Sequence, residues 1–108
     1  MKSSDLVGVY TAKYGHGSET LTLAADATFS QVYAQLEDGR STTNSGSWAL
    51  DRQRGDIVLT GAYSFDKDGK RAKEPFVKTM SVLRVAVRLG QISLVYGERG
   101  VEEYQKVK

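Results

Sequence analysis

The feature that most constrains the fold is a series of short segments in which apolar residues alternate with polar or small ones. Leucine, isoleucine and aromatic residues recur at every second position of these segments, and glycine or aspartate residues stand between them. A period of two places apolar side chains on one face of a strand and polar ones on the other, as in antiparallel sheets with one buried face. The chain is therefore predicted to be all-β.

Eight strands follow from this pattern, and no helix is predicted. Their expected ranges are Leu6–Tyr14, Glu19–Ala25, Thr28–Leu36, Ser41–Leu50, Asp56–Phe65, Phe76–Leu89, Ile92–Tyr96 and Val101–Val107. The apolar residues of the sixth strand change phase midway, which predicts a β-bulge or a corner near Ser81–Leu83. Short turns favour a meander, and closing the meander removes exposed edges. We predict one domain, residues 1–108, folded as a single antiparallel up-and-down β-barrel of about eight strands.

Composition limits the chemistry and the partners. The chain has 15 Lys and Arg against 13 Asp and Glu, a net charge of +2, which is too balanced to indicate a polyanion as partner. The lack of cysteine excludes disulfides, thiolate metal sites and thiol catalysis. No segment reaches the ~20 apolar residues of a transmembrane helix. We expect a monomer or homodimer with no membrane span and no nucleic-acid partner.

The first residues do not indicate a compartment. The opening Met1-Lys-Ser-Ser-Asp5 contains no apolar signal region. We expect a cytoplasmic protein, or a periplasmic one if a leader has been removed. The sequence leaves both localisations open.

Several motifs together carry a resemblance to a known family. They are Leu6-x-Gly8-x-Tyr10, Leu21-Thr-Leu23-x-x-Asp26-x-x-Phe29, Gly46-Ser-Trp48-x-Leu50, Ile57-x-Leu59 and Glu103-Tyr104-x-Lys106-Val107. In this order they resemble small bacterial lipocalin-like (calycin-type) barrels, typified by the amino-terminal barrel of the NlpE envelope lipoprotein. The resemblance implies a lipocalin-like barrel that binds a small ligand.

The chain departs from that family in two places. NlpE-like barrels carry a Cys-x-x-Cys after the first strand, where this chain has Tyr14-Gly-His-Gly17. A metal or redox role of those thiols therefore does not transfer. True lipocalins place Gly-x-Trp on the first strand, whereas Gly46-Ser-Trp48 lies in the middle of this chain.

Seven residues are predicted to line a ligand site in the barrel mouth. They share an inward strand phase and combine aromatic walls with a few polar groups, as ligand pockets do. They are Tyr10, Phe29, Gln31, Tyr33, Trp48, Tyr63 and Tyr96. Two alternatives stay open: Trp48 is either a ligand-stacking wall or a core plug, and Gln31 and Gln35 either line a pocket or face water.

No catalytic residue, metal site or cofactor is predicted. His16, the only histidine, lies between two glycines, and we interpret it as a solvated loop residue without a catalytic partner. One histidine without cysteine also argues against a transition-metal site. Asp66 and Asp68 begin a segment similar to a calcium loop, but Lys70 and Val77 occupy two of its ligand positions.

The sequence thus predicts a non-enzymatic binding domain that holds a small amphipathic or apolar ligand in the barrel mouth. The alternative is a filled barrel that acts as a protein–protein interaction module, such as a sensor, an inhibitor or an immunity-type protein. Its binding surface would combine the basic loop 66–75 with the outward face of the sixth strand, which carries Arg84 and Arg88.

Overall fold

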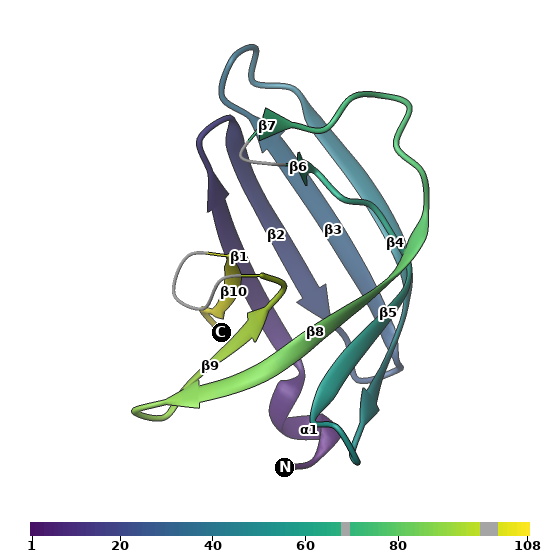
Figure 1. Ribbon diagram of the computed structural model, residues 1–108, viewed down its shortest axis with the longest axis vertical. Helices are drawn as coiled ribbons and strands as arrows, with labels where there is room; N and C mark the ends of the chain where they lie inside the picture. The colour runs from purple at the N-terminus through teal and green to yellow at the C-terminus, as the bar shows by residue number, and fades with distance from the viewer. Residues whose placement is uncertain (68–69, 98–101) are drawn as a thin grey trace.

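The strands close into an antiparallel eight-stranded β-barrel in the computed structural model, which describes residues 1–67, 70–97 and 102–108 (Figure 1). The barrel strands are β1 (Gly8–Tyr14), β2 (Gly17–Leu23), β3 (Thr28–Gln35), β4 (Ser41–Asp51), β5 (Asp56–Ala62), β8 (Thr79–Arg88), β9 (Gln91–Val95) and β10 (Glu103–Lys106). Strands adjacent in this order pair with each other, and β1 closes the ring by pairing Tyr10 with Lys106. The all-β, eight-stranded barrel is confirmed.

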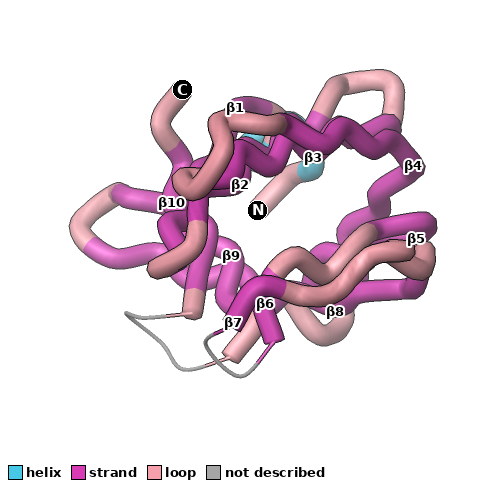
Figure 2. The backbone as a smooth tube through the Cα atoms, turned by 90° about the horizontal axis from the view of Figure 1, so that it is seen from above, coloured by secondary structure: helices cyan, strands magenta, loops and turns pink. Residues whose placement is uncertain are grey.

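A short helix at the amino terminus was not expected. Helix α1 (Ser3–Leu6) lies below the barrel, and Figure 2, which looks down from the opposite end, shows it within the ring of strands. Leu6 is fully buried, and the Lys2 amide donates to the Asp5 carboxylate at 2.9 Å. The prediction of no helix was wrong because four residues are too few to show helical periodicity. We call this the closed end of the barrel.

The segment between β5 and β8, residues 63–67 and 70–78, lies at the other end, which we call the mouth. We name this segment the strap. It contains the two-residue strands β6 (Asp66–Lys67) and β7 (Lys70–Arg71), which pair with each other. The predicted irregular loop therefore holds a small hairpin, and the predicted fifth and sixth strands are shorter than expected. Asp68 and Val101, which belonged to predicted elements, lie outside the described residues.

The β-bulge is on β5, not at the predicted position on β8. The register between β5 and β8 shifts between Thr60 and Ala62, and Gly61 there has a φ of 85°, which glycine adopts without strain. The predicted bulge or corner near Ser81–Leu83 was wrong: these residues pair with β5 in unbroken register, and the phase change arises because β8 carries apolar residues on both faces. Leu83 is buried, whereas Met80 and Val82 are 69% and 56% exposed.

The apolar core fills the closed half of the barrel. Its largest members come from every side of the ring, and they are Leu6, Tyr10, Leu21, Leu23, Phe29, Trp48, Ile57, Leu59, Leu83, Leu94 and Tyr104, the last of which reaches into the mouth half. Gly46 makes room for Phe29, since a Cβ at Gly46 would lie 2.6 Å from the Phe29 ring. The polar tips inside are paired: Tyr10 donates to the Leu6 carbonyl at 2.6 Å, and Trp48 to the Ala24 carbonyl at 2.8 Å.

Candidate functional site

A buried carboxyl group lies in the mouth half of the barrel. Glu19, on β2, is 1% exposed. The Tyr14 hydroxyl on β1 donates to its Oε1 at 2.7 Å, and the Tyr104 hydroxyl on β10 donates to both its oxygens at 3.0 and 2.9 Å. The Gln31 amide on β3 donates to Oε2 at 3.0 Å. Four strands that are neighbours in the ring thus direct polar groups to one point.

Gln31 connects this carboxyl to the strap. Its Nε2 also donates to the Tyr63 carbonyl at 3.0 Å. Its Oε1 accepts from the Asn44 amide at 2.8 Å and from the Tyr63 backbone N–H at 2.9 Å. A glutamine amide has two hydrogens and two acceptor lone pairs. All four are used within the protein, so Gln31 orders the site instead of offering a hydrogen bond to a ligand.

Burial sets the electrostatics of this network. It raises the pKa of Glu19, and the hydrogen bonds donated by Gln31, Tyr14 and Tyr104 lower that pKa in part. Burial also raises the pKa of Tyr104 well above its usual value, with the charge of Glu19 adding to the effect. It raises the pKa of Tyr96 to about 12. These tyrosines are therefore neutral hydrogen-bonding groups.

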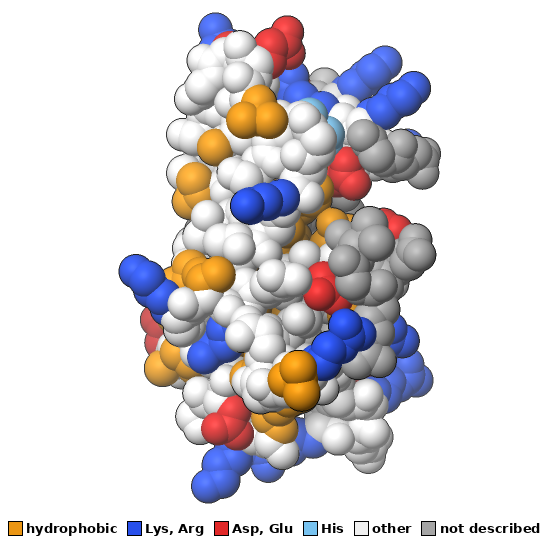
Figure 3. Space-filling view, turned by 90° about the vertical axis from the view of Figure 1, so that its left-hand side faces the viewer, with side chains coloured by type: hydrophobic (Ala, Val, Ile, Leu, Met, Phe, Trp, Pro, Cys, Tyr) orange, Lys and Arg blue, Asp and Glu red, His pale blue; other side chains and the backbone are white. Residues whose placement is uncertain are grey.

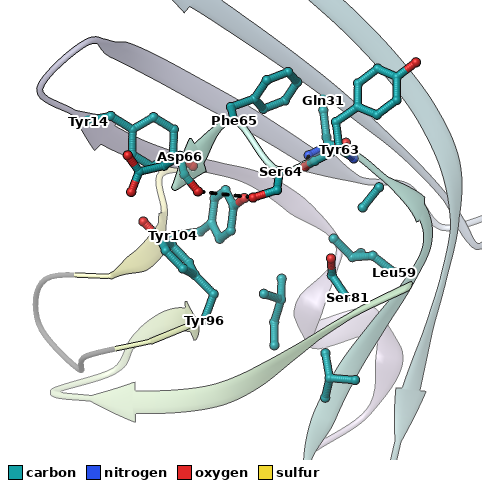
Figure 4. A pocket seen from close by; sticks show the side chains of 13 residues that line it. Tyr14, Gln31, Leu59, Tyr63, Ser64, Phe65, Asp66, Ser81, Tyr96 and Tyr104 are labelled. Carbon is teal, nitrogen blue, oxygen red and sulfur yellow. Dashed lines mark hydrogen bonds between the residues drawn. The ribbon is translucent and has the colours of Figure 1, made fainter. Parts of the chain in front are cut away.

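A cavity of about 260 Å³ lies beside the network, between β5, the strap, β8 and the β9–β10 hairpin (Figure 4). Its walls mix aromatic rings, aliphatic side chains and a few polar groups. The lining residues are Tyr14, Gln31, Leu59, Ala62, Tyr63, Ser64, Phe65, Asp66, Ser81, Val82, Leu83, Tyr96 and Tyr104. The cavity thus reaches from the edge of the apolar core to the strap.

Three of the seven predicted site residues line this cavity, namely Gln31, Tyr63 and Tyr96. Tyr10, Phe29 and Trp48 belong to the core cluster instead, so Trp48 occupies the position of a core plug. Tyr33 is fully buried beside the strap, outside the cavity lining. Both glutamines whose exposure was left open are buried: Gln31 is 1% and Gln35 6% exposed.

His16 is not the solvated loop residue that was predicted. Its side chain is 16% exposed, and its Nε2 lies 2.8 Å from Asp66 Oδ1 on the strap. Its Nδ1 lies 2.6 Å from the Tyr33 hydroxyl, and its ring stacks on that of Tyr14 at 5.2 Å. The prediction failed because Asp66 is 50 positions away in sequence. We call Tyr33, His16 and Asp66 the latch.

The latch resembles a relay of acid, base and hydroxyl, but its geometry fits a structural role. Tyr33 is 0% exposed, so its hydroxyl has no surface on which a substrate could approach. Its ring stacks on Phe65 of the strap, with centroids 4.8 Å apart and planes 12° apart. The polar and aromatic contacts together hold the strap in place at the barrel mouth.

Sequence reasoning missed Glu19, Asn44 and Tyr104 as members of the site. For two of them, the alternation of apolar and polar residues along the strands contained a signal. Glu19 shares the phase of Leu21 and Leu23, and Asn44 shares the phase of Trp48, so both fall on inward positions. A polar residue at an inward position requires a buried partner. The identity of that partner depends on which strands are neighbours.

Three further findings concern metal binding, membrane helices and similarity to known proteins. In the described part of the chain, no group of three or more His, Asp and Glu side chains could hold a metal ion. No helix among the described residues is long and apolar enough to cross a membrane. Comparisons of the chain with family models, curated proteins and solved structures found no match.

Proposed function

We propose that this protein is a non-enzymatic binding domain that holds a small amphipathic ligand in the cavity at the barrel mouth. The observation that carries the proposal is the cavity of about 260 Å³ with aromatic and aliphatic walls beside a hydrogen-bonded network. Pockets for drug-sized molecules hold about 300–1,000 Å³ and have apolar walls with a few polar groups. The volume therefore suits a ligand somewhat smaller than a typical drug.

The chemistry of the walls supports an amphipathic ligand. Leu59, Ala62 and Leu83 supply aliphatic surface on the barrel side. Hydroxyl groups of Ser81 and Tyr96 lie in the same lining, where they can orient a polar group of the ligand. An apolar body would gain from burial, while the hydroxyls would fix its orientation.

The order of the walls supports a preformed site. Every buried side-chain nitrogen and oxygen in the described residues has a hydrogen-bond partner. Gln31 and the latch fix the strap, so the cavity does not need to be organised when a ligand arrives. Preorganised walls reduce the entropy lost on binding. The barrel and its motif likeness to lipocalin-like proteins are consistent with the same proposal.

The proposal is tested by filling the cavity. In Ser81→Trp, an indole should occupy the lining, whereas Met80→Trp places the same indole at a neighbouring, 69% exposed position and serves as the control. We expect a native mass spectrum of the wild type and of Met80→Trp, purified from the natural host, to show a bound small molecule that denaturation releases. Ser81→Trp should lack it. An adduct that Ser81→Trp retains would contradict the proposed site.

A second candidate function is a protein-interaction module that uses the strap and the outward face of β8. Met80 and Val82 expose apolar surface next to Arg84 on β8. A groove of about 680 Å³ along the strap is lined by Phe76 and several basic side chains, which are Lys67, Lys70, Arg71 and Lys73. This combination fits an acidic protein surface with an apolar centre.

The face shown in Figure 3 offers no such apolar and basic patch among the side chains described, since its hydrophobic groups are scattered among polar ones.

A Lys67→Glu/Lys70→Glu variant should lose partners captured by the wild type if the second candidate is correct. Lys13→Glu/Arg52→Glu, at exposed positions on β1 and on the turn between β4 and β5, makes the same change in net charge and serves as the control. Equal capture by all three proteins would contradict the second candidate.

A further inference from the structure

The cavity and the groove on the strap differ in charge. The groove is lined by four basic side chains. Among the described residues that line the cavity, the one charged side chain is Asp66, and none is Lys or Arg. Asp66 Oδ1 faces His16 of the latch, and the carboxylate lies at the rim with 18% of its side chain exposed. The cavity side of the strap is therefore acidic.

A second carboxyl group acts on the cavity through tyrosine hydroxyls. Tyr14 and Tyr104 line the cavity and donate their hydroxyl hydrogens to Glu19 behind them. When Glu19 is ionised, both hydroxyl hydrogens are donated to it, so these hydroxyls can offer a ligand only acceptor oxygens. The buried carboxylate thus gives these two walls the character of hydrogen-bond acceptors.

Aromatic rings make up much of the remaining wall. The rings belong to Tyr14, Tyr63, Phe65, Tyr96 and Tyr104. Tyr96 and Tyr104 lie side by side at one side of the cavity with tilted rings, whereas the rings of Tyr63 and Phe65, which meet edge to face, point away from its centre (Figure 4). The face of an aromatic ring attracts a cation through its quadrupole, and desolvation strengthens this attraction.

From these observations we propose that the cavity binds an organic cation, a small molecule with an ammonium group and an apolar body. The proposal rests on the proposed function and names its ligand class. The ammonium group lies among the aromatic rings, with Asp66 at the rim and the acceptor oxygens of Tyr14 and Tyr104 as hydrogen-bond partners. The apolar body contacts Leu59 and Leu83.

The state of Glu19 supports a cationic rather than an anionic ligand. Burial raises the pKa of Glu19 because desolvation disfavours its negative charge. A positive charge in the adjoining cavity would compensate it, whereas an anion would be repelled by both Glu19 and Asp66. A neutral ligand of the same shape would gain only from burial.

The test uses three probes of nearly equal shape: 2-phenylethylammonium, neutral 2-phenylethanol and anionic phenylacetate. Each is titrated into the full chain and followed by ¹H–¹⁵N NMR and calorimetry. We expect the ammonium probe to bind at least about tenfold more tightly than the alcohol, and to shift amide signals of residues that line the cavity. Phenylacetate should bind more weakly than the alcohol.

Variants of two acidic residues test the contribution of negative charge separately from that of the cavity's shape. Glu19→Gln and Asp66→Asn each keep a hydrogen-bonding group in place and remove one negative charge, so each should reduce the preference for the ammonium probe severalfold. Asp26→Asn removes one charge at an exposed turn near the closed end, where Asp26 bonds to Thr28, and should leave the preference unchanged. The alcohol measures in each variant whether the cavity is intact.

The outcomes distinguish the two proposals. If the alcohol or phenylacetate binds as tightly as the ammonium probe at the cavity, the cation proposal is overturned and the binding function stands. If Asp26→Asn reduces the preference as much as Asp66→Asn, the attraction comes from net charge and the cation site is overturned. If none of the probes shifts cavity signals at millimolar concentration, both proposals fail.

Discussion

The two halves of the barrel are built from the same alternating strands, but they are stabilised by different interactions. In the closed half, inward positions carry residues such as Leu21, Leu23 and Ile57, and α1 covers the end. In the mouth half, the same inward rows carry Glu19, Gln31 and other polar groups. The closed half is stabilised by apolar burial, and the mouth half by a fully paired polar network.

This difference indicates where function lies. Burying polar groups is unfavourable unless each is paired, and a partly satisfied network is destabilising. A barrel that needed only stability would continue its apolar core to the mouth. The polar half lies instead beside the cavity, and its tyrosines form part of the cavity wall. We infer that the closed half provides stability and the mouth half provides the binding site.

The largest effect is expected in the closed half. Trp48→Ala removes a core side chain that is 6% exposed and a hydrogen bond to the Ala24 carbonyl. The free energy of unfolding should fall by about 3–5 kcal/mol, much of the stability of a domain of this size. Urea denaturation followed by circular dichroism measures it, with Trp48→Phe as the milder control. A loss below about 1 kcal/mol would show that the closed half is not the main source of stability.

The second prediction concerns the latch at the mouth. A double-mutant cycle of His16→Ala and Asp66→Ala should give a coupling free energy of about 1–2 kcal/mol, because the pair is largely buried and hydrogen-bonded. The exposed Asp38–Arg40 pair, with its atoms 3.6 Å apart, is the matched control and should couple by less than about 1 kcal/mol. Equal coupling in both pairs would argue against a latch.

The third prediction uses the buried carboxyl group. The pKa of Glu19 is raised in the folded state, so its contribution to stability is complete below the pKa of the unfolded chain. That contribution is lost as the pH rises through the raised pKa. Relative to Glu19→Gln, the wild type should therefore become less stable from about pH 4.5 upward. Urea unfolding of both proteins between pH 4 and pH 9, in about half-unit steps, measures the difference. A difference that stays constant with pH would contradict the raised pKa.

The smallest effect is expected at the bulge that leads from β5 into the strap. Gly61→Ala places a Cβ where the nearest atom, in the Lys78 side chain, is 3.9 Å away, so space is sufficient and backbone strain at a φ of 85° dominates. The free energy of unfolding should fall by about 1 kcal/mol. Thr60→Ala, at the exposed neighbouring position, should change stability by less than about 0.5 kcal/mol. Thermal unfolding of the two variants, monitored together, gives the comparison.

Particular residues show how far the sequence could be interpreted. The spacing of Leu21, Leu23 and Trp48 indicates that they occupy inward strand positions, and the barrel follows from such patterns. The bulge was predicted on the wrong strand because Met80 and Val82 are exposed, and an exposed apolar residue looks the same as a buried one in a sequence. Of the seven predicted site residues, Gln31, Tyr63 and Tyr96 line the cavity, Tyr33 belongs to the latch, and Tyr10, Phe29 and Trp48 lie in the core.

The sequence by itself determined the strand pattern, the antiparallel order and the absence of thiol chemistry, because these depend on local period and composition. Only the tertiary structure decided that His16 meets Asp66 and that Tyr104 donates to Glu19, 85 positions away. Closure of the ring brings β10 beside β1, and the strap lies along one side of the mouth, where Asp66 reaches His16. Contacts at such separations depend on the registers of all the intervening strands, which no local pattern encodes.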